Sequence, residues 1–136
     1  MVKVIMGKRG SGKTKQVIDM INSAVQTEHG NVVCIEKGNK MTFDIHYQIR
    51  LVEASQYDIA NYTALKGFIS GLYAGNYDIT HIFIDSLYKI TGDDDDSKAG
   101  AFLEKLEKFS EANGVKVTIT ISDDIEAADE TIKKFF

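Results

Sequence analysis

The chain has 136 residues, of which 43% are hydrophobic and 26% are charged, a composition typical of soluble globular proteins. Its length favours one domain, residues 1–136, with a core of its own. The net charge of −4 gives no general attraction to nucleic acid or to an anionic membrane. The single cysteine, Cys34, excludes an intrachain disulfide and a cysteine-based zinc site. No run approaches the ~18 apolar residues that span a bilayer, and the chain starts with no signal-peptide pattern, so we expect a cytoplasmic protein.

Strands and helices alternate along the hydrophobic pattern of the first half. In chain order, the pattern predicts a strand at 2–6, a helix at 13–28, a strand at 31–36 and a strand at 49–53. The strand at 2–6 is mostly apolar, which favours burial on both of its faces. Residues 41–45 are expected to form a further short strand in a segment of weak pattern.

The second half continues this alternation. It predicts a helix at 61–75, a strand at 79–85, a helix at 97–113, a strand at 115–121 and a last helix at 124–136. Apolar and polar residues alternate in the strand at 115–121, which predicts one less buried face. The order of elements implies parallel strands joined by helical crossovers. We therefore expect a three-layer α/β/α sandwich around a mostly parallel sheet of about five strands.

A phosphate-binding motif follows the first predicted strand directly. Residues 7–14 read Gly-Lys-Arg-Gly-Ser-Gly-Lys-Thr, which is the G-x-x-x-x-G-K-[ST] pattern, and the helix predicted at 13–28 begins at its end. Glycines let backbone amides approach an anion closely, and a helix N-terminus favours negative charge. Lys13 is expected to reach the β- and γ-phosphates, and Thr14 to bind Mg²⁺ through its hydroxyl. The residues expected to bind the nucleotide are Gly7, Lys8, Arg9, Gly10, Ser11, Gly12, Lys13, Thr14 and Lys15.

Acidic residues stand at the carboxyl ends of three predicted strands, where ligands of parallel sheets bind. Asp85 ends the apolar run 82–84, and we expect it to hold Mg²⁺ from a strand beside the first one. Glu36 and Glu53 end two other strands, and each is a candidate general base for attack on the terminal phosphate. A run of aspartates at 93–96 lies further along the chain and predicts a flexible, solvated loop.

Segments 2–21 and 79–86 resemble the core of phosphate-loop NTPases, and in outline a minimal RecA-like core. They are also similar to the nucleotide-binding half of tetrameric thymidine kinases, although those carry an Asp-Glu pair and a cysteine-rich zinc lobe. The resemblance implies that Asp85 is the Walker B aspartate. Related ATPases with an added catalytic glutamate often carry it at the next position, where this chain has Ser86. The resemblance also implies that Ser122, at the end of the last strand, senses the γ-phosphate.

The expected function is binding of a nucleoside triphosphate with Mg²⁺, and ATP is favoured because no guanine-recognition signature is present. The leading interpretation is a slow Mg²⁺-dependent ATPase, in which Lys13 stabilises developing charge and Glu36 or Glu53 acts as the base. One alternative is a small-molecule or nucleoside kinase with its acceptor pocket in 37–60. The other is a non-enzymatic, nucleotide-gated partner subunit. No arginine stands at an evident finger position, so a protein partner would have to supply one. Neither a membrane nor a nucleic acid is indicated.

Overall fold

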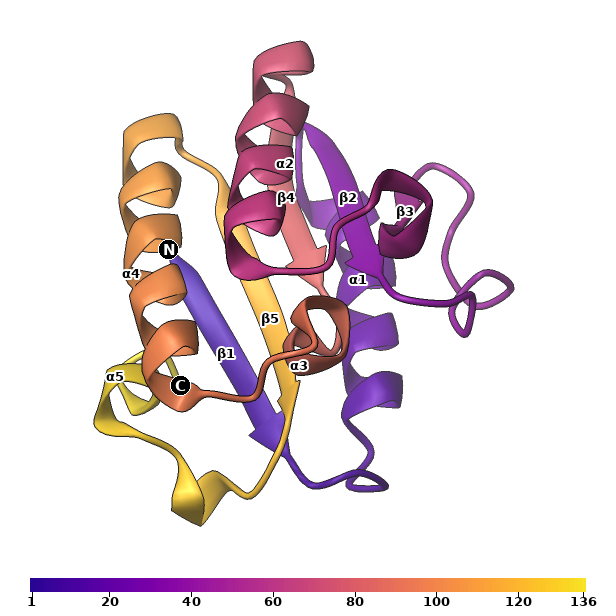
Figure 1. The fold of residues 1–136 in the computed structure, drawn as a ribbon. Helices are drawn as coiled ribbons and strands as arrows, with labels where there is room; N and C mark the ends of the chain where they lie inside the picture. Colours follow the sequence, from indigo (N-terminus) through magenta and orange to yellow (C-terminus); the bar gives the residue numbers. More distant parts are fainter.

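The computed structural model describes residues 1–136 and contains five parallel strands in the order β1-β5-β4-β2-β3 (Figure 1). The strands are β1 (Val2–Gly7), β2 (Asn31–Glu36), β3 (Arg50–Glu53), β4 (Ile79–Ile84) and β5 (Lys116–Ser122). The α-helices are α1 (Lys13–Thr27), α2 (Tyr62–Gly75), α3 (Leu87–Thr91), α4 (Asp96–Asn113) and α5 (Glu130–Lys133). Two 3-10 turns are η1 (Ala54–Tyr57) and η2 (Ile125–Ala127). The all-parallel sheet with helical crossovers confirms the predicted fold class.

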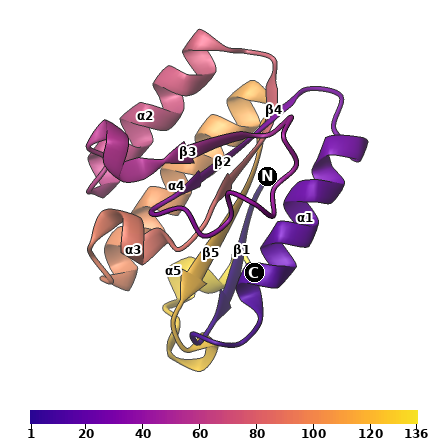
Figure 2. The ribbon, with the colours of Figure 1, turned by 90° about the vertical axis from the view of Figure 1, so that its right-hand side faces the viewer.

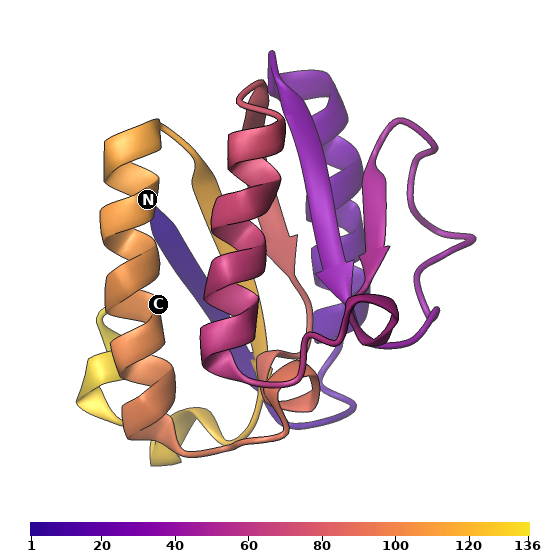
Figure 3. The same ribbon diagram turned by 45° about the horizontal axis from the view of Figure 1, so that its top comes forward.

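Helices cover both faces of the sheet, which makes a three-layer α/β/α sandwich (Figure 2). α1 lies on one face, whereas α2 and α4 lie side by side on the other (Figure 3). The larger core cluster, of 27 buried residues, includes the inward faces of α2 and α4, and the smaller, of 8, includes that of α1. None of the helices combines the length and the apolar character needed to cross a bilayer. Because all strands are parallel, their carboxyl ends gather at one edge, the lower edge in Figure 1.

β5 is a central strand, not the half-exposed strand that its alternation predicts. It lies between β1 and β4, and as a result Thr118 and Thr120 are 4% and 0% exposed. Buried hydroxyls need hydrogen-bond partners. Thr118 Oγ1 lies 2.9 Å from His81 Nε2, and Thr120 Oγ1 donates to Asp85 Oδ1 at 2.7 Å. The polar positions of this strand therefore meet buried polar partners instead of solvent.

β1 is an edge strand, and only one of its faces is fully covered. Lys3 is exposed and Ile5 is half-buried, so the prediction of burial on both faces is wrong. The reason lies in the position of α1. Its cluster contains Cys34 of β2 and Phe83 of β4, and no residue of β1. The single helix of this layer thus covers the other end of the sheet.

Residues 41–45 form turns instead of the predicted short strand. Met41 is fully buried in the cluster beneath α1. Asn22 of α1 holds the segment with both ends of its side chain, because its Nδ2 donates to Asp44 O and its Oδ1 accepts from His46 N, each at 2.8 Å. The connection between β2 and β3 therefore packs onto α1 and does not join the sheet.

The last predicted helix, at 124–136, is interrupted. Asp124 and Asp129 each accept a hydrogen bond from the amide two residues later, and so start the separate short elements η2 and α5. Ile125 is consequently 48% exposed, although its spacing predicts an inward position. The other residues predicted to point inward are buried, namely Ala128, Ile132 and Phe135.

Gly30, directly before β2, has no room for a side chain. A Cβ built there would lie 2.3 Å from the backbone oxygen of Asp78 and 2.3 Å from Cγ2 of Thr80. Gly30→Ala should therefore lower the free energy of unfolding by about 1–3 kcal/mol, the usual cost of overpacking. Gly67→Ala is the matched control, because Gly67 lies exposed within α2 with open space around it. This second change should raise stability by up to about 1 kcal/mol. Urea unfolding measures both effects, and equal midpoints would contradict the expectation.

His81 is held among buried partners near the amino-terminal ends of the strands. Its Nδ1 lies 4.0 Å from Glu28 Oε2, which also accepts a hydrogen bond from Lys116 Nζ at 2.6 Å. Its ring stacks on that of Phe83, with 4.0 Å between the centroids. Burial lowers the pKa of His81 to about 4, and the Glu28 charge only partly opposes this shift.

Acid should therefore destabilise the fold through His81. The unfolded chain protonates this ring near pH 6.5 and the folded chain only near pH 4, so the unfolded state binds more protons between these values. The free energy of unfolding should fall as the pH decreases through this window, by less than roughly 3 kcal/mol because the ring is not fully buried. His81→Gln removes the titration and should lose less stability over the same window. Urea unfolding at several pH values tests this, and identical slopes in both proteins would refute it.

Candidate functional site

The loop between β1 and α1 turns sharply and leaves most of its amides without an acceptor in the chain. Gly10 and Gly12 have φ angles of +84° and +87°, in the left-handed region that favours glycine. Ser11 N donates to Lys8 O at 3.1 Å, whereas the amides of Gly10, Gly12 and Lys13 make no backbone hydrogen bond. Amides that are free in such a loop, directly before a helix N-terminus, favour an anion.

The side chain of Lys13 folds back over this loop. It is 9% exposed, and its Nζ donates to Lys8 O at 3.2 Å. Burial lowers the pKa of Lys13, and the charge of Asp85 opposes this shift. The charges of Lys40 and Arg9 add to the lowering. Lys13 makes no ion pair in the chain, and an anion bound in the loop would stabilise its charged form further.

Asp85 follows β4, one strand further from β1 than the sequence predicts. β5, the last strand of the chain, inserts between them, and Ser122 pairs in register with Gly7. The expectation of a neighbouring strand is thus wrong. The carboxylate of Asp85 is buried, and it accepts hydrogen bonds from Thr120 Oγ1 at 2.7 Å and from Ser86 Oγ at 3.2 Å. These hydroxyls hold the carboxylate at the carboxyl edge of the sheet.

A pocket of about 860 Å³ opens at this edge. Its wall includes residues of the β1–α1 loop, Ser122 at the end of β5, Lys40 in the connection after β2, and Tyr88 and Lys89 of α3. Only one of its 14 lining residues is hydrophobic. The volume is within the range of small-molecule sites, and so polar a wall suits a charged, hydrophilic ligand.

The pocket brings together about half of the predicted nucleotide-binding residues. Those that line it are Arg9, Gly10, Gly12, Lys13 and Thr14. Those outside its wall are Gly7, Lys8, Ser11 and Lys15. Gly7 is buried at the end of β1, and Lys8 Nζ lies 3.7 Å from Asp124 Oδ2. The polar residue expected at the end of β5, Ser122, lies in the wall.

Thr14 and Asp85 are the candidate Mg²⁺ ligands. No group of three His, Cys, Asp or Glu side chains is placed to hold a metal ion. In nucleotide sites Mg²⁺ commonly takes one or two protein oxygens and completes its shell with phosphate oxygens and water. Thr14 lines the pocket, and the Asp85 carboxylate is bonded to Ser86, which also lines it. Asp85 itself is buried directly behind this wall and does not line the pocket, so only the oxygen chemistry of the two residues fits Mg²⁺ with a phosphate ligand.

The two candidate bases differ in environment, and neither lines the pocket. Glu36 is 2% exposed and accepts a hydrogen bond from Met41 N at 3.4 Å. Burial raises the pKa of Glu36, the Met41 hydrogen bond opposes this, and the nearby charge of Asp85 raises it further. Glu53 instead accepts hydrogen bonds from Gly38 N, at 2.7 Å, and from Ser55, which lower its pKa. Of the two, Glu36 therefore has the environment that suits a base.

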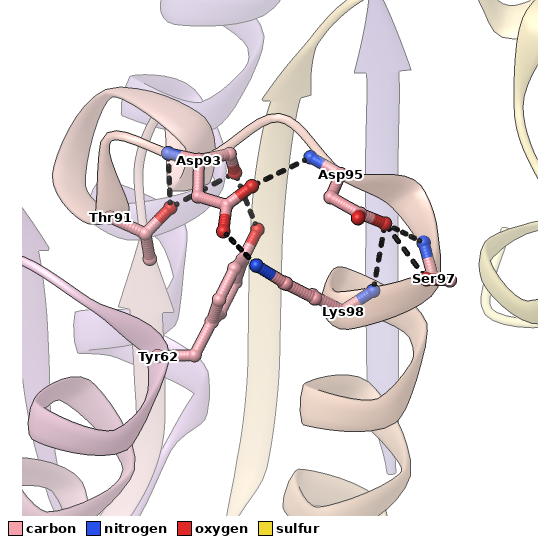
Figure 4. Close-up of polar contacts among 6 residues, drawn as sticks. All are labelled: Tyr62, Thr91, Asp93, Asp95, Ser97 and Lys98. Carbon is pink, nitrogen blue, oxygen red and sulfur yellow. Dashed lines mark hydrogen bonds and ion pairs between the residues drawn. The ribbon is translucent and has the colours of Figure 1, made fainter.

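The aspartates at 93–96 were predicted to form a flexible, solvated loop. Residues 93–95 do connect α3 to α4 without regular structure, and Asp94 and Asp95 are exposed, but hydrogen bonds hold Asp93 and Asp95 (Figure 4). Asp95 caps the helix by accepting the amide of Ser97 at 2.9 Å. The carboxylate of Asp93 lies 3.1 Å from Lys98 Nζ, and its backbone oxygen accepts the hydroxyl of Tyr62 at 2.8 Å. Asp93 and Asp95 thus have partners within the chain, and Asp93 and Asp94 also line the pocket.

Three residues of the wall were missed by sequence reasoning: Lys40, Tyr88 and Lys89. No motif contains them, because Lys40 lies in an irregular connection and the other two lie in α3, a helix too short to show a period. Only the folded chain brings them to the phosphate loop.

Comparison with known proteins assigns no family to this chain. The sequence matches no protein-family model and no curated protein.

Proposed function

We propose that this chain is a phosphate-loop nucleotide-binding protein that binds ATP with Mg²⁺ in the pocket beside the β1–α1 loop. The observation that carries the proposal is the loop itself, whose amides at Gly10, Gly12 and Lys13 have no acceptor in the chain. A glycine-rich loop with free amides before a helix is the arrangement that holds the phosphates in this class of protein.

Each part of the pocket has a role in this proposal. The amides and the Lys13 ammonium bind the β- and γ-phosphates, since charge-assisted hydrogen bonds are the strong ones. Thr14 and Asp85 hold Mg²⁺, which would neutralise phosphate charge. The Thr120 and Ser86 hydroxyls, which hydrogen-bond the Asp85 carboxylate, would hold it in place for this ion. Because nucleoside triphosphates are cytosolic ligands, a cytoplasmic location belongs to the proposal.

We propose that the chain hydrolyses ATP only slowly. Ser86 occupies the position after Asp85 and has no carboxylate with which to orient a water. Glu36, with its raised pKa, is the better of the two candidate bases, but it lies outside the pocket wall. The same observation favours a second candidate function, a nucleotide-gated subunit that binds ATP without hydrolysing it.

Calorimetric titration with ATP, GTP and ADP, with and without Mg²⁺, tests the proposal. We expect saturable binding of ATP that Mg²⁺ strengthens. Phosphate release measured on the same samples separates the slow ATPase from the gated subunit, and a panel of nucleoside acceptors tests kinase activity. The absence of any nucleotide binding at millimolar concentration would overturn the proposal.

A further inference from the structure

Two lysines reach the pocket from elements that the phosphate motif does not contain. Lys40 belongs to the connection after β2, and Lys89 belongs to α3, which follows β4. In the strand order, β4 and β2 lie on the far side of β5 from β1. The phosphate loop follows β1 and therefore reaches the pocket from one side of β5. Lys40 and Lys89 follow β2 and β4 and reach the pocket from the other side of β5.

The two lysine-bearing segments lie against each other. A Cβ built on Gly38, two residues before Lys40, would be 3.9 Å from Lys89 Nζ. The ammonium of Lys89 therefore lies over the turn that carries Lys40. Two positive side chains from different parts of the chain thus both line the pocket.

Packing holds both backbones while leaving the side chains exposed. Beside Lys40, Met41 is fully buried. Gly38 N donates to Glu53 Oε1 at 2.7 Å, which ties the same turn to the end of β3. Lys89 lies between Leu87 and Ile90, which are 0% and 1% exposed. Packing therefore fixes the backbone at Lys40 and Lys89, while both side chains stay exposed.

Neither lysine has a counter-ion in the chain. No carboxylate lies within ion-pair distance of Lys40 or Lys89. Asp93, Asp94 and Asp123 line the same pocket; Asp93 is paired with Lys98 at 3.1 Å, and Asp94 and Asp123 are in no ion pair. The wall thus holds four cations, at Arg9, Lys13, Lys40 and Lys89, against two unpaired carboxylates. Cations gathered without partners repel one another, and a multiply charged anion relieves that repulsion.

We infer that Lys40 and Lys89 form a clamp, within this one chain, for the terminal phosphate of a bound nucleoside triphosphate. The inference rests on the proposed function and extends it. The β1–α1 loop and Lys13 bind the β-phosphate, which ATP and ADP share, and also the γ-phosphate, whereas the clamp binds only the γ-phosphate that the triphosphate carries. The two lysines would supply the positive charge that, from the sequence alone, an arginine finger of a partner protein was expected to supply.

Calorimetry with AMP-PNP and ADP, each with Mg²⁺, tests the clamp. The variants are Lys40→Gln, Lys89→Gln and the double change, and Lys37→Gln is the control, because Lys37 lies exposed in the same connection but outside the pocket wall. We expect the double variant to bind AMP-PNP about tenfold or more weakly, the loss typical of a charge-assisted contact. Its affinity for ADP should change less than about threefold, and Lys37→Gln should change neither. Because the replaced side chains are exposed, thermal unfolding should be the same in all four proteins.

The outcomes separate the clamp from the proposed function. Equal weakening of AMP-PNP and ADP, or no weakening of AMP-PNP, would overturn the clamp and leave nucleotide binding in place. A wild-type protein that binds neither ligand would overturn the proposed function, and the clamp with it.

Discussion

Lys13→Ala is expected to weaken ATP binding roughly 100-fold or more, because hydrogen bonds to charged groups contribute about 1.5–3 kcal/mol each and Lys13 would reach two phosphates. The fold should survive, because the ammonium makes one hydrogen bond in the chain and its burial disfavours the charged form. Titration calorimetry measures the affinity, and thermal unfolding checks the fold.

Lys37→Ala provides the control for charge alone, since Lys37 is exposed and outside the pocket wall. It should bind ATP like the wild type. Unchanged affinity in Lys13→Ala, with the fold intact, would refute the role of this lysine.

Asp85→Asn is expected to remove the dependence of ATP affinity on Mg²⁺. The amide keeps the shape of the side chain, and its oxygen can still accept the Thr120 hydroxyl, but it loses the charge that attracts the cation. Affinity in Mg²⁺ should therefore fall, by roughly 10–100-fold, toward the value measured in EDTA. The change should also lower the pKa of Glu36, which the Asp85 charge now raises.

Asp19→Asn is the matched control, because Asp19 is exposed on α1 and does not line the pocket. It removes the same charge from the same protein and should leave the Mg²⁺ effect unchanged. If Asp85→Asn retained the full Mg²⁺ effect, the metal would have to be held elsewhere.

The candidate site divides into a part that sequence predicts well and a part that it does not. The strand, loop and helix at the phosphate motif were predicted because their signals are local. β-branched residues precede the loop, glycines punctuate it and a helical period follows. The bounds of β1 and α1 agree with these signals closely.

The predictions that failed for β5 and for residues 93–96 share one cause, which is that contacts between distant residues decided the outcome. The alternation in β5 correctly marks Thr118 and Thr120 as polar, but it cannot tell whether solvent or His81 and Asp85 face them. Periodicity reports which residues share a face, and not which strand lies alongside. The aspartates at 93–96 were likewise predicted to be a solvated loop, whereas Asp95 caps α4 and Asp93 pairs with Lys98.

By itself, the sequence determined the alternation of strands and helices, and with it a parallel sheet carrying a glycine-rich loop at its carboxyl edge, because these depend on residues close together along the chain. Only the tertiary structure decided that β5 inserts between β1 and β4, that the Thr120 hydroxyl of β5 holds Asp85, and that Lys40 and Lys89 both line the pocket. Strand order follows from how helices and connections pack across the whole sheet, and such contacts between distant residues leave no mark on local composition or spacing.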